Sequence, residues 1–159
     1  MLYIGQFDYT VDLQGRINLP GEWRGDESNC TFILVPEGTE ALVLMPEDDF
    51  LSFFTGLQKL SLADPELRLA AARIGAVSRS CRCDRQGRLT LPKIQLENAG
   101  ISKNIKLIGA VTHIRICAPE KWNVENIDNI VAGKLKRIEK LGNDNGALAA
   151  LIEGVLENE

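Results

Sequence analysis

Two arginines follow matching short segments in this 159-residue chain. The segment Asp12-Leu13-Gln14-Gly15-Arg16 recurs 72 residues later as Asp84-Arg85-Gln86-Gly87-Arg88. A guanidinium presents its N–H donors as a planar fork, which matches the paired acceptors of a guanine edge or of a phosphate group. The two arginines are therefore candidates for binding a nucleic-acid base or an anion.

The residues around each arginine predict a tight hairpin. In Asp-x-x-Gly, the aspartate accepts backbone N–H bonds within a type I turn, and the glycine takes the left-handed conformation that closes it. The flanking residues alternate between apolar and polar, as in a strand with one buried face. The predicted buried residues are Val11, Ile17 and Leu19 in the first copy, and Cys83, Leu89 and Leu91 in the second. The opposite face is expected to carry Thr10, Asp12, Arg16 and Asn18, and in the second copy Arg82, Asp84, Arg88 and Thr90.

The similarity between the copies continues beyond the hairpins. Apolar runs predict further strands at 31–35 and 41–45 in the first copy, and at 105–108 and 114–117 in the second. Each last run ends in a Pro-Glu step that is typical of a helix start, and a further helix is predicted over 64–73 with Asp64 as its N-cap. We predict an α+β chain with repeated units at 1–63 and 76–124, a connecting helix at 64–75 and a helical tail at 125–159.

Positive charge is concentrated in one part of a chain whose net charge is −4. Residues 68–106 hold nine basic and two acidic residues, which leaves +7 there. The acidic remainder excludes a histone-like protein, whereas a basic face that docks on a polyanion is compatible with this pattern.

A two-stranded ribbon fits the major groove of DNA. The candidate DNA-binding residues are Arg16, Arg88, Arg82, Arg85, Asn18 and Thr90, positioned by the turn residues Asp12, Gly15, Asp84 and Gly87. The motif alone also fits a plain turn in which each arginine only pairs with its own aspartate.

Other chemistry finds little support in the sequence. There is no glycine-rich phosphate loop, and His113 has no nucleophile or carboxylate constellation around it. The spacing of Cys30, Cys81, Cys83 and Cys117 gives neither a disulfide framework nor paired zinc-binding knuckles. Cys81 and Cys83 are expected to be buried or half-buried small hydrophobic side chains. We predict no enzyme activity, no cofactor and no metal.

No apolar run approaches the roughly 20 residues that span a bilayer, and a secretory signal is not apparent, so a cytoplasmic protein is expected.

The repeated motif resembles the MraZ family. The first half carries Gly5-x-Phe7-x-Tyr9-Thr10-Val11-Asp12-x-Gln14-Gly15-Arg16-Ile17-x-Leu19-Pro20-x-x-Trp23-Arg24. The second half carries Gly75-Ala76-Val77, then Asp84-x-Gln86-Gly87-Arg88-x-x-Leu91-Pro92 and Ala99-Gly100. The resemblance covers about 1–124. It departs from the family at Gln14, where lysine is usual, and at Leu96, where a basic residue is common.

The resemblance implies a fold and a function. It implies two SpoVT/AbrB-like swapped-hairpin units, each with a β core and a following helix. It also implies a nucleoid-associated transcriptional regulator, usually a repressor, of the division and cell-wall gene cluster. Such proteins form homo-oligomeric rings and bind short promoter repeats in double-stranded DNA, with Arg16 and Arg88 at the contacting positions. Two alternatives remain open: an AbrB-like protein-interaction scaffold without promoter binding, and an antitoxin of the same broad fold.

Overall fold

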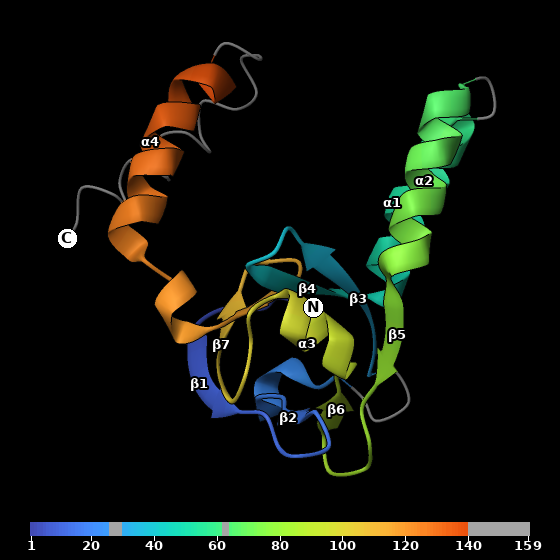
Figure 1. Cartoon of the computed structure of the whole chain (residues 1–159). Coiled ribbons are helices and arrows are strands. Elements are labelled where there is room, and N and C mark those ends of the chain that lie inside the picture. The colour runs from blue at the N-terminus through green and yellow to red at the C-terminus, as the bar shows by residue number, and fades with distance from the viewer. Residues whose placement is uncertain (26–29, 62–63, 140–159) are drawn as a thin grey trace. The chain divides into compact units, whose positions relative to one another are not determined.

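A computed structural model describes residues 1–25, 30–61 and 64–139 of the chain. The chain divides into two compact units, Met1–Lys121 and Trp122–Glu159. The fold is α+β, as predicted, and every pair of strands is antiparallel. All the strands of the described residues belong to the first unit (Figure 1).

The elements of the described residues follow one another in two similar series. The strands are β1 (Gln6–Thr10), β2 (Arg16–Asn18), β3 (Thr31–Glu37), β4 (Ala41–Pro46), β5 (Arg79–Arg82), β6 (Arg88–Thr90), β7 (Asn104–Gly109) and β8 (Ile114–Cys117). The α-helices are α1 (Glu47–Ser61), α2 (Pro65–Val77), α3 (Lys93–Asn98) and α4 (Val124–Glu139). Two 3-10 turns, η1 (Gly21–Trp23) and η2 (Pro119–Lys121), complete the series.

The two copies share their sheets. A six-stranded sheet has the order β1-β7-β8-β4-β3-β5, and β2 pairs with β6 in a separate two-stranded ribbon. The first strand of each copy thus pairs with the other copy, β1 with β7 and β5 with β3. When each strand is replaced by its equivalent in the other copy (β1 by β5, β3 by β7, β4 by β8), the same strand order is obtained in reverse. The repeat boundaries at 1–63 and 76–124 stay a prediction, since both copies are interleaved in one unit.

The core beneath the ribbon is built from both copies. Ile17 and Leu19 from β2 and its end are fully buried, as are Leu89 and Leu91 from β6 and its end. Their burial confirms the predicted alternation, because these residues are two apart along each strand. Trp23 of η1 adds an edge-to-face contact with Phe7, at 5.0 Å between ring centroids.

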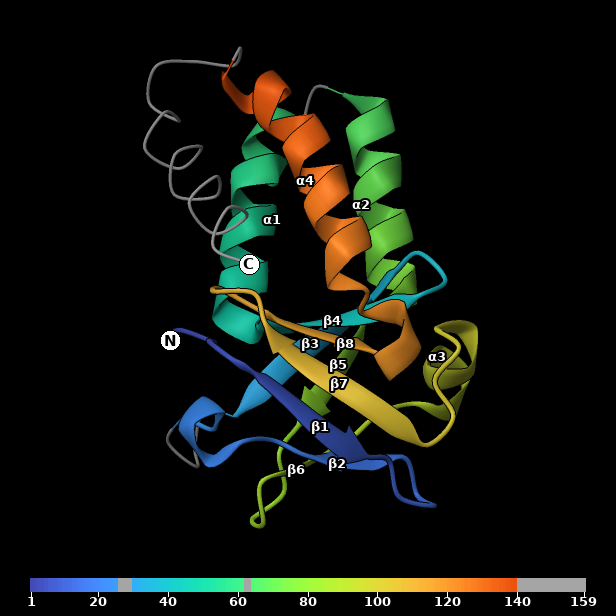
Figure 2. The ribbon, with the colours of Figure 1, turned by 90° about the vertical axis from the view of Figure 1, so that its left-hand side faces the viewer.

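The helix starts were predicted with mixed success. Helix α1 begins directly after Pro46, and α2 begins at Pro65, with the carboxylate of Asp64 accepting the N–H of Glu66 at 2.9 Å. Both starts confirm the prediction, although α2 runs on to Val77 and packs beside α1 (Figures 1 and 2). The start expected at Pro119-Glu120 is wrong: that step forms the 3-10 turn η2. Helix α4 begins at Val124 instead, because the side chain of Asn123 caps it by accepting the N–H of Asn126 at 2.9 Å.

Helix α4 confirms the predicted helical tail as far as Glu139. Residues 140–159, the rest of the predicted helical tail, lie outside the described residues. No helix among the described residues is both long enough and apolar enough to cross a membrane.

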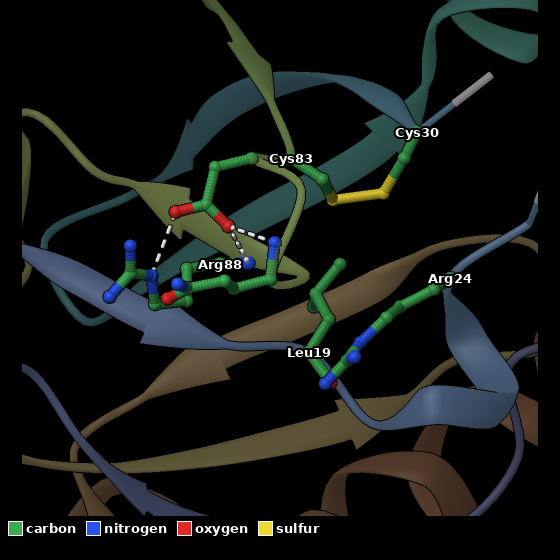
Figure 3. Close-up of a disulfide and its surroundings, with 7 residues drawn as sticks. Leu19, Arg24, Cys30, Cys83 and Arg88 are labelled. Atoms are coloured by element: carbon green, nitrogen blue, oxygen red, sulfur yellow. Dashed lines mark hydrogen bonds and ion pairs between the residues drawn. A yellow bond between two sulfur atoms is a disulfide. The ribbon is translucent and has the colours of Figure 1, made fainter. Parts of the chain in front are cut away.

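A disulfide joins Cys30 to Cys83, so the expectation that no disulfide forms is wrong (Figure 3). Cys30 directly precedes β3 and Cys83 directly follows β5, and the N–H of Cys83 donates to the carbonyl of Cys30 at 2.9 Å. This pairing brings the two Cα atoms to 5.4 Å, within the usual range for a disulfide. Cys81 and Cys117 are buried free thiols, and burial raises the pKa of Cys81 to about 11. Cys81 is buried and Cys83 is half-buried, as expected, but Cys83 is bonded to Cys30 and is not a separate apolar thiol.

Candidate nucleic-acid interface

Both turns have the predicted geometry. The N–H of Gly15 donates to the carbonyl of Asp12 at 3.0 Å, and that of Gly87 donates to Asp84 at 2.9 Å. Gly15 and Gly87 have φ angles of 76° and 75°, in the left-handed region that glycine adopts without strain. The arginine that follows each turn is therefore the first residue of the next strand, β2 or β6.

Each turn aspartate holds its own arginine. One oxygen of Asp12 accepts the backbone N–H groups of Gln14 and Arg16, both at 2.9 Å, and the other accepts Nε of Arg16 at 2.6 Å. Asp84 repeats these bonds, with Nε of Arg88 at 2.7 Å. The hydrogen bond from the arginine backbone is the largest cause that lowers the pKa of each aspartate. Both carboxylates are therefore ionised at neutral pH and fix the direction of the arginine side chains.

Four of the predicted DNA-binding residues lie on one face of the β2–β6 ribbon. Arg16 lies opposite Thr90, and Asn18 lies opposite Arg88. The pair between them, Ile17 and Leu89, points to the core. Arg16 and Arg88 are diagonal neighbours on the outward face, with about 7–8 Å expected between their Cα atoms. The ribbon thus presents two guanidinium groups, an amide and a hydroxyl side by side.

The ion pairs leave one edge of each guanidinium for another partner. The side chains of Arg16 and Arg88 are 34% and 31% exposed, and both pairs use Nε. The Nη2 of Arg16 also donates to the side chain of Gln14 at 3.2 Å, whereas in the described part of the chain the Nη atoms of Arg88 bind nothing (Figure 3). The pairing that the plain-turn alternative expects is therefore present. It orients the arginines at the surface and does not bury them.

Arg82 and Arg85 lie off the ribbon. Arg82 ends β5 opposite Thr31, and Arg85 lies in the second turn, both exposed. Between them and the first copy lies a groove that Arg24 also lines. Sequence reasoning missed Arg24, because its position becomes meaningful only once the first copy packs against the second turn. The signal that could have found it is the basic residue after Trp23 in the first half.

Gly15→Ala is expected to destabilise the protein by about 3 kcal/mol. The left-handed φ costs a residue with a Cβ about 1–2 kcal/mol, and an ideal Cβ at Gly15 would lie 2.7 Å from the carbonyl oxygen of Leu91. That oxygen belongs to the ribbon end, where the N–H of Leu91 donates to Gly15, so moving it strains the ribbon as well. Urea denaturation of the variant measures the loss.

Gly38→Ala is the matched control for that prediction. Gly38 has a φ of 61° but nothing within 4 Å of an ideal Cβ, so only the conformational cost of about 1–2 kcal/mol applies. Equal losses in the two variants would mean that the contact between the turn and the ribbon contributes nothing.

Known proteins that are similar to this chain share one name. No protein-family model matches the chain. The chain is 31% identical over 143 residues to the transcriptional regulator MraZ of Caldicellulosiruptor bescii, a match that covers 89% of this chain and 99% of the relative. The chain belongs to the MraZ family. Proteins with the same name from Alkaliphilus metalliredigens and Lachnoclostridium phytofermentans are 27% and 26% identical, and cover 89% and 81% of the chain.

The family match covers the second half of the candidate interface as well as most of the fold. An alignment that covers 89% of 159 residues must include residues 20–140, and hence β6 and the whole second turn. The resemblance stated from the motifs alone is therefore confirmed for MraZ, with relatives that carry the name of transcriptional regulators.

Proposed function

We propose that this chain is a sequence-specific DNA-binding transcriptional regulator, whose β2–β6 ribbon enters the major groove. The main support for the proposal is that Arg16, Asn18, Arg88 and Thr90 all lie on the outward face of this ribbon. A two-stranded antiparallel ribbon has the right width for the major groove. The MraZ relatives, named as transcriptional regulators, support the same reading.

The side chains suggest distinct roles within this interface. The Nη groups of Arg16 and Arg88 match O6 and N7 of guanine, although Nη2 of Arg16 must then share its donors with Gln14. The amide of Asn18 matches the edge of adenine. Thr90 offers a hydroxyl and a methyl group beside them. Arg82 and Arg85 add attraction to the phosphate backbone, which strengthens binding without reading sequence.

The regulator acts as a repressor of a division and cell-wall gene cluster, by occupying promoter DNA, as the family resemblance implies. The pairing of β1 with β7 and of β5 with β3 supports two interleaved swapped-hairpin units of the SpoVT/AbrB kind. A single chain contacts few phosphates, so it binds weakly alone. A homo-oligomeric ring on short promoter repeats joins several ribbons and raises the apparent affinity by about 100-fold or more.

Binding of the full chain to duplex DNA from upstream of its own gene tests the proposal. Fluorescence anisotropy is measured against a scrambled duplex of equal length at two salt concentrations. We expect about 10³-fold preference for the upstream duplex, the lower end for specific DNA-binding proteins. Absence of any binding at low salt contradicts the proposal and supports the scaffold alternative.

A further inference from the structure

A cationic groove lies beside the second turn. Its volume is about 570 Å³, and its charged lining residues are Arg24, Arg82, Arg85 and Asp84. The one carboxylate among them is already occupied, since Asp84 accepts two backbone N–H groups and Nε of Arg88. Among the described lining residues, three arginines therefore surround a single carboxylate, which is already paired with Arg88.

Arg24 reaches this groove from the other copy. Its Nε donates to the carbonyl of Leu19 at 2.8 Å, which fixes the side chain beneath the end of β2 (Figure 3). Its guanidinium lies so close to Gly87 that a Cβ at that position would overlap it. The second turn is thus built directly against a held positive charge.

The equivalent groove at the first turn has a different chemistry. Its lining includes Leu13, Lys93, Leu96, Glu97 and Lys103. Leu96 occupies the repeat position of Arg24 and lies 3.9 Å from the Cβ position of Gly15, as Arg24 lies against Gly87. Lys93 is 3.8 Å from Glu97, which partly neutralises it, and the fully exposed Leu13 stands where the second turn has Arg85.

We infer that the groove of Arg24, Arg82 and Arg85 binds a backbone phosphate of the duplex whose bases the ribbon reads, and that the first-turn groove does not. The inference rests on the proposed function. Arginine binds phosphate by charge-assisted, two-pronged hydrogen bonds, and three arginines around one space suit the negatively charged oxygens of a backbone phosphate. The groove adjoins the turn that carries Arg88, so a duplex on the ribbon has its backbone within reach. The two turns of one chain therefore differ in phosphate binding, and the groove at the second turn supplies most of the salt-dependent part of the affinity for DNA.

The salt dependence of binding by the full chain tests this inequality. Each phosphate contact contributes about −0.9 to the slope of log K against log salt concentration. We compare R82Q/R85Q with K93Q/K103Q, which removes the same charge from the first-turn groove. Arg24 is left in place, because it also supports Leu19 and Gly87. The expected slope becomes shallower by about 1 in R82Q/R85Q, as for one lost phosphate contact, and by less than half as much in K93Q/K103Q.

The outcomes separate the inference from the proposed function. Equal changes of slope in the two variants, with wild-type binding intact, overturn the inference alone. No binding of the wild-type chain to any duplex at low salt overturns the proposed function and the inference with it. A titration with inorganic phosphate, followed through the arginine Nε–H signals by NMR, forms a second arm. Saturation at Arg82 and Arg85 below about 1 mM phosphate, the weak end of the affinity scale for specific ligands, would assign the groove to a free anion and overturn the inference.

Discussion

The double variant R16A/R88A is expected to lose about 100-fold or more of its affinity for the upstream duplex. A bidentate arginine–guanine contact contributes about 1–3 kcal/mol of discrimination, so each single variant should lose roughly 10-fold. The two arginines lie on the same outward face of the ribbon, diagonal to each other, so both contact the duplex in one binding event. Anisotropy titrations at fixed salt measure the losses.

The fold should survive these substitutions. The pairs of Arg16 with Asp12 and of Arg88 with Asp84 are partly exposed, and solvent screens such pairs so that they contribute little to the stability of the fold. Lys121→Ala is a matched control for each single arginine variant, because it removes one charge from an exposed pair, with Glu40, that lies off the ribbon. Unchanged affinity in R16A/R88A, or an equal loss in Lys121→Ala, would remove the ribbon from the interface.

The local part of the site could be predicted because it depends on residues close in sequence. The Asp-x-x-Gly turn determines its own hydrogen bonds, and the alternation of Ile17 and Leu19 with polar neighbours determines which face is buried. Both features are repeated in the second copy, where the structure confirms them at Gly87, Leu89 and Leu91.

The pairing between copies could not be predicted in the same way. A period of two shows that β1 and β5 are half-buried strands, but it holds no information about which partner each strand takes. The disulfide could not be predicted for the same reason. Cys30 and Cys83 are 53 residues apart and become neighbours only because β5 pairs with β3. Arg24 was missed for the same reason, since its partner Gly87 belongs to the other copy.

Loss of the Cys30–Cys83 disulfide is expected to lower the free energy of unfolding by about 4 kcal/mol. The bond closes a loop with a sequence separation of 53 residues. In the chain-entropy description, a cross-link of this length restricts the unfolded chain by roughly that amount. The variant C30A/C83A is compared with the oxidised wild-type chain by urea denaturation, with and without a reducing agent.

The reducing agent provides the internal control for this prediction. It should lower the urea midpoint of the wild-type chain to near that of C30A/C83A, and it should leave the variant itself unchanged. The native strands hold Cys30 and Cys83 together even without the bond, because the N–H of Cys83 still donates to the carbonyl of Cys30 and β5 still pairs with β3. The loss should therefore arise from the greater freedom of the unfolded chain, and DNA affinity well below the midpoint should change little. A wild-type midpoint that does not respond to reduction would show that the bond contributes nothing to stability. A large loss of DNA affinity on reduction would instead mean that the bond itself positions the second turn.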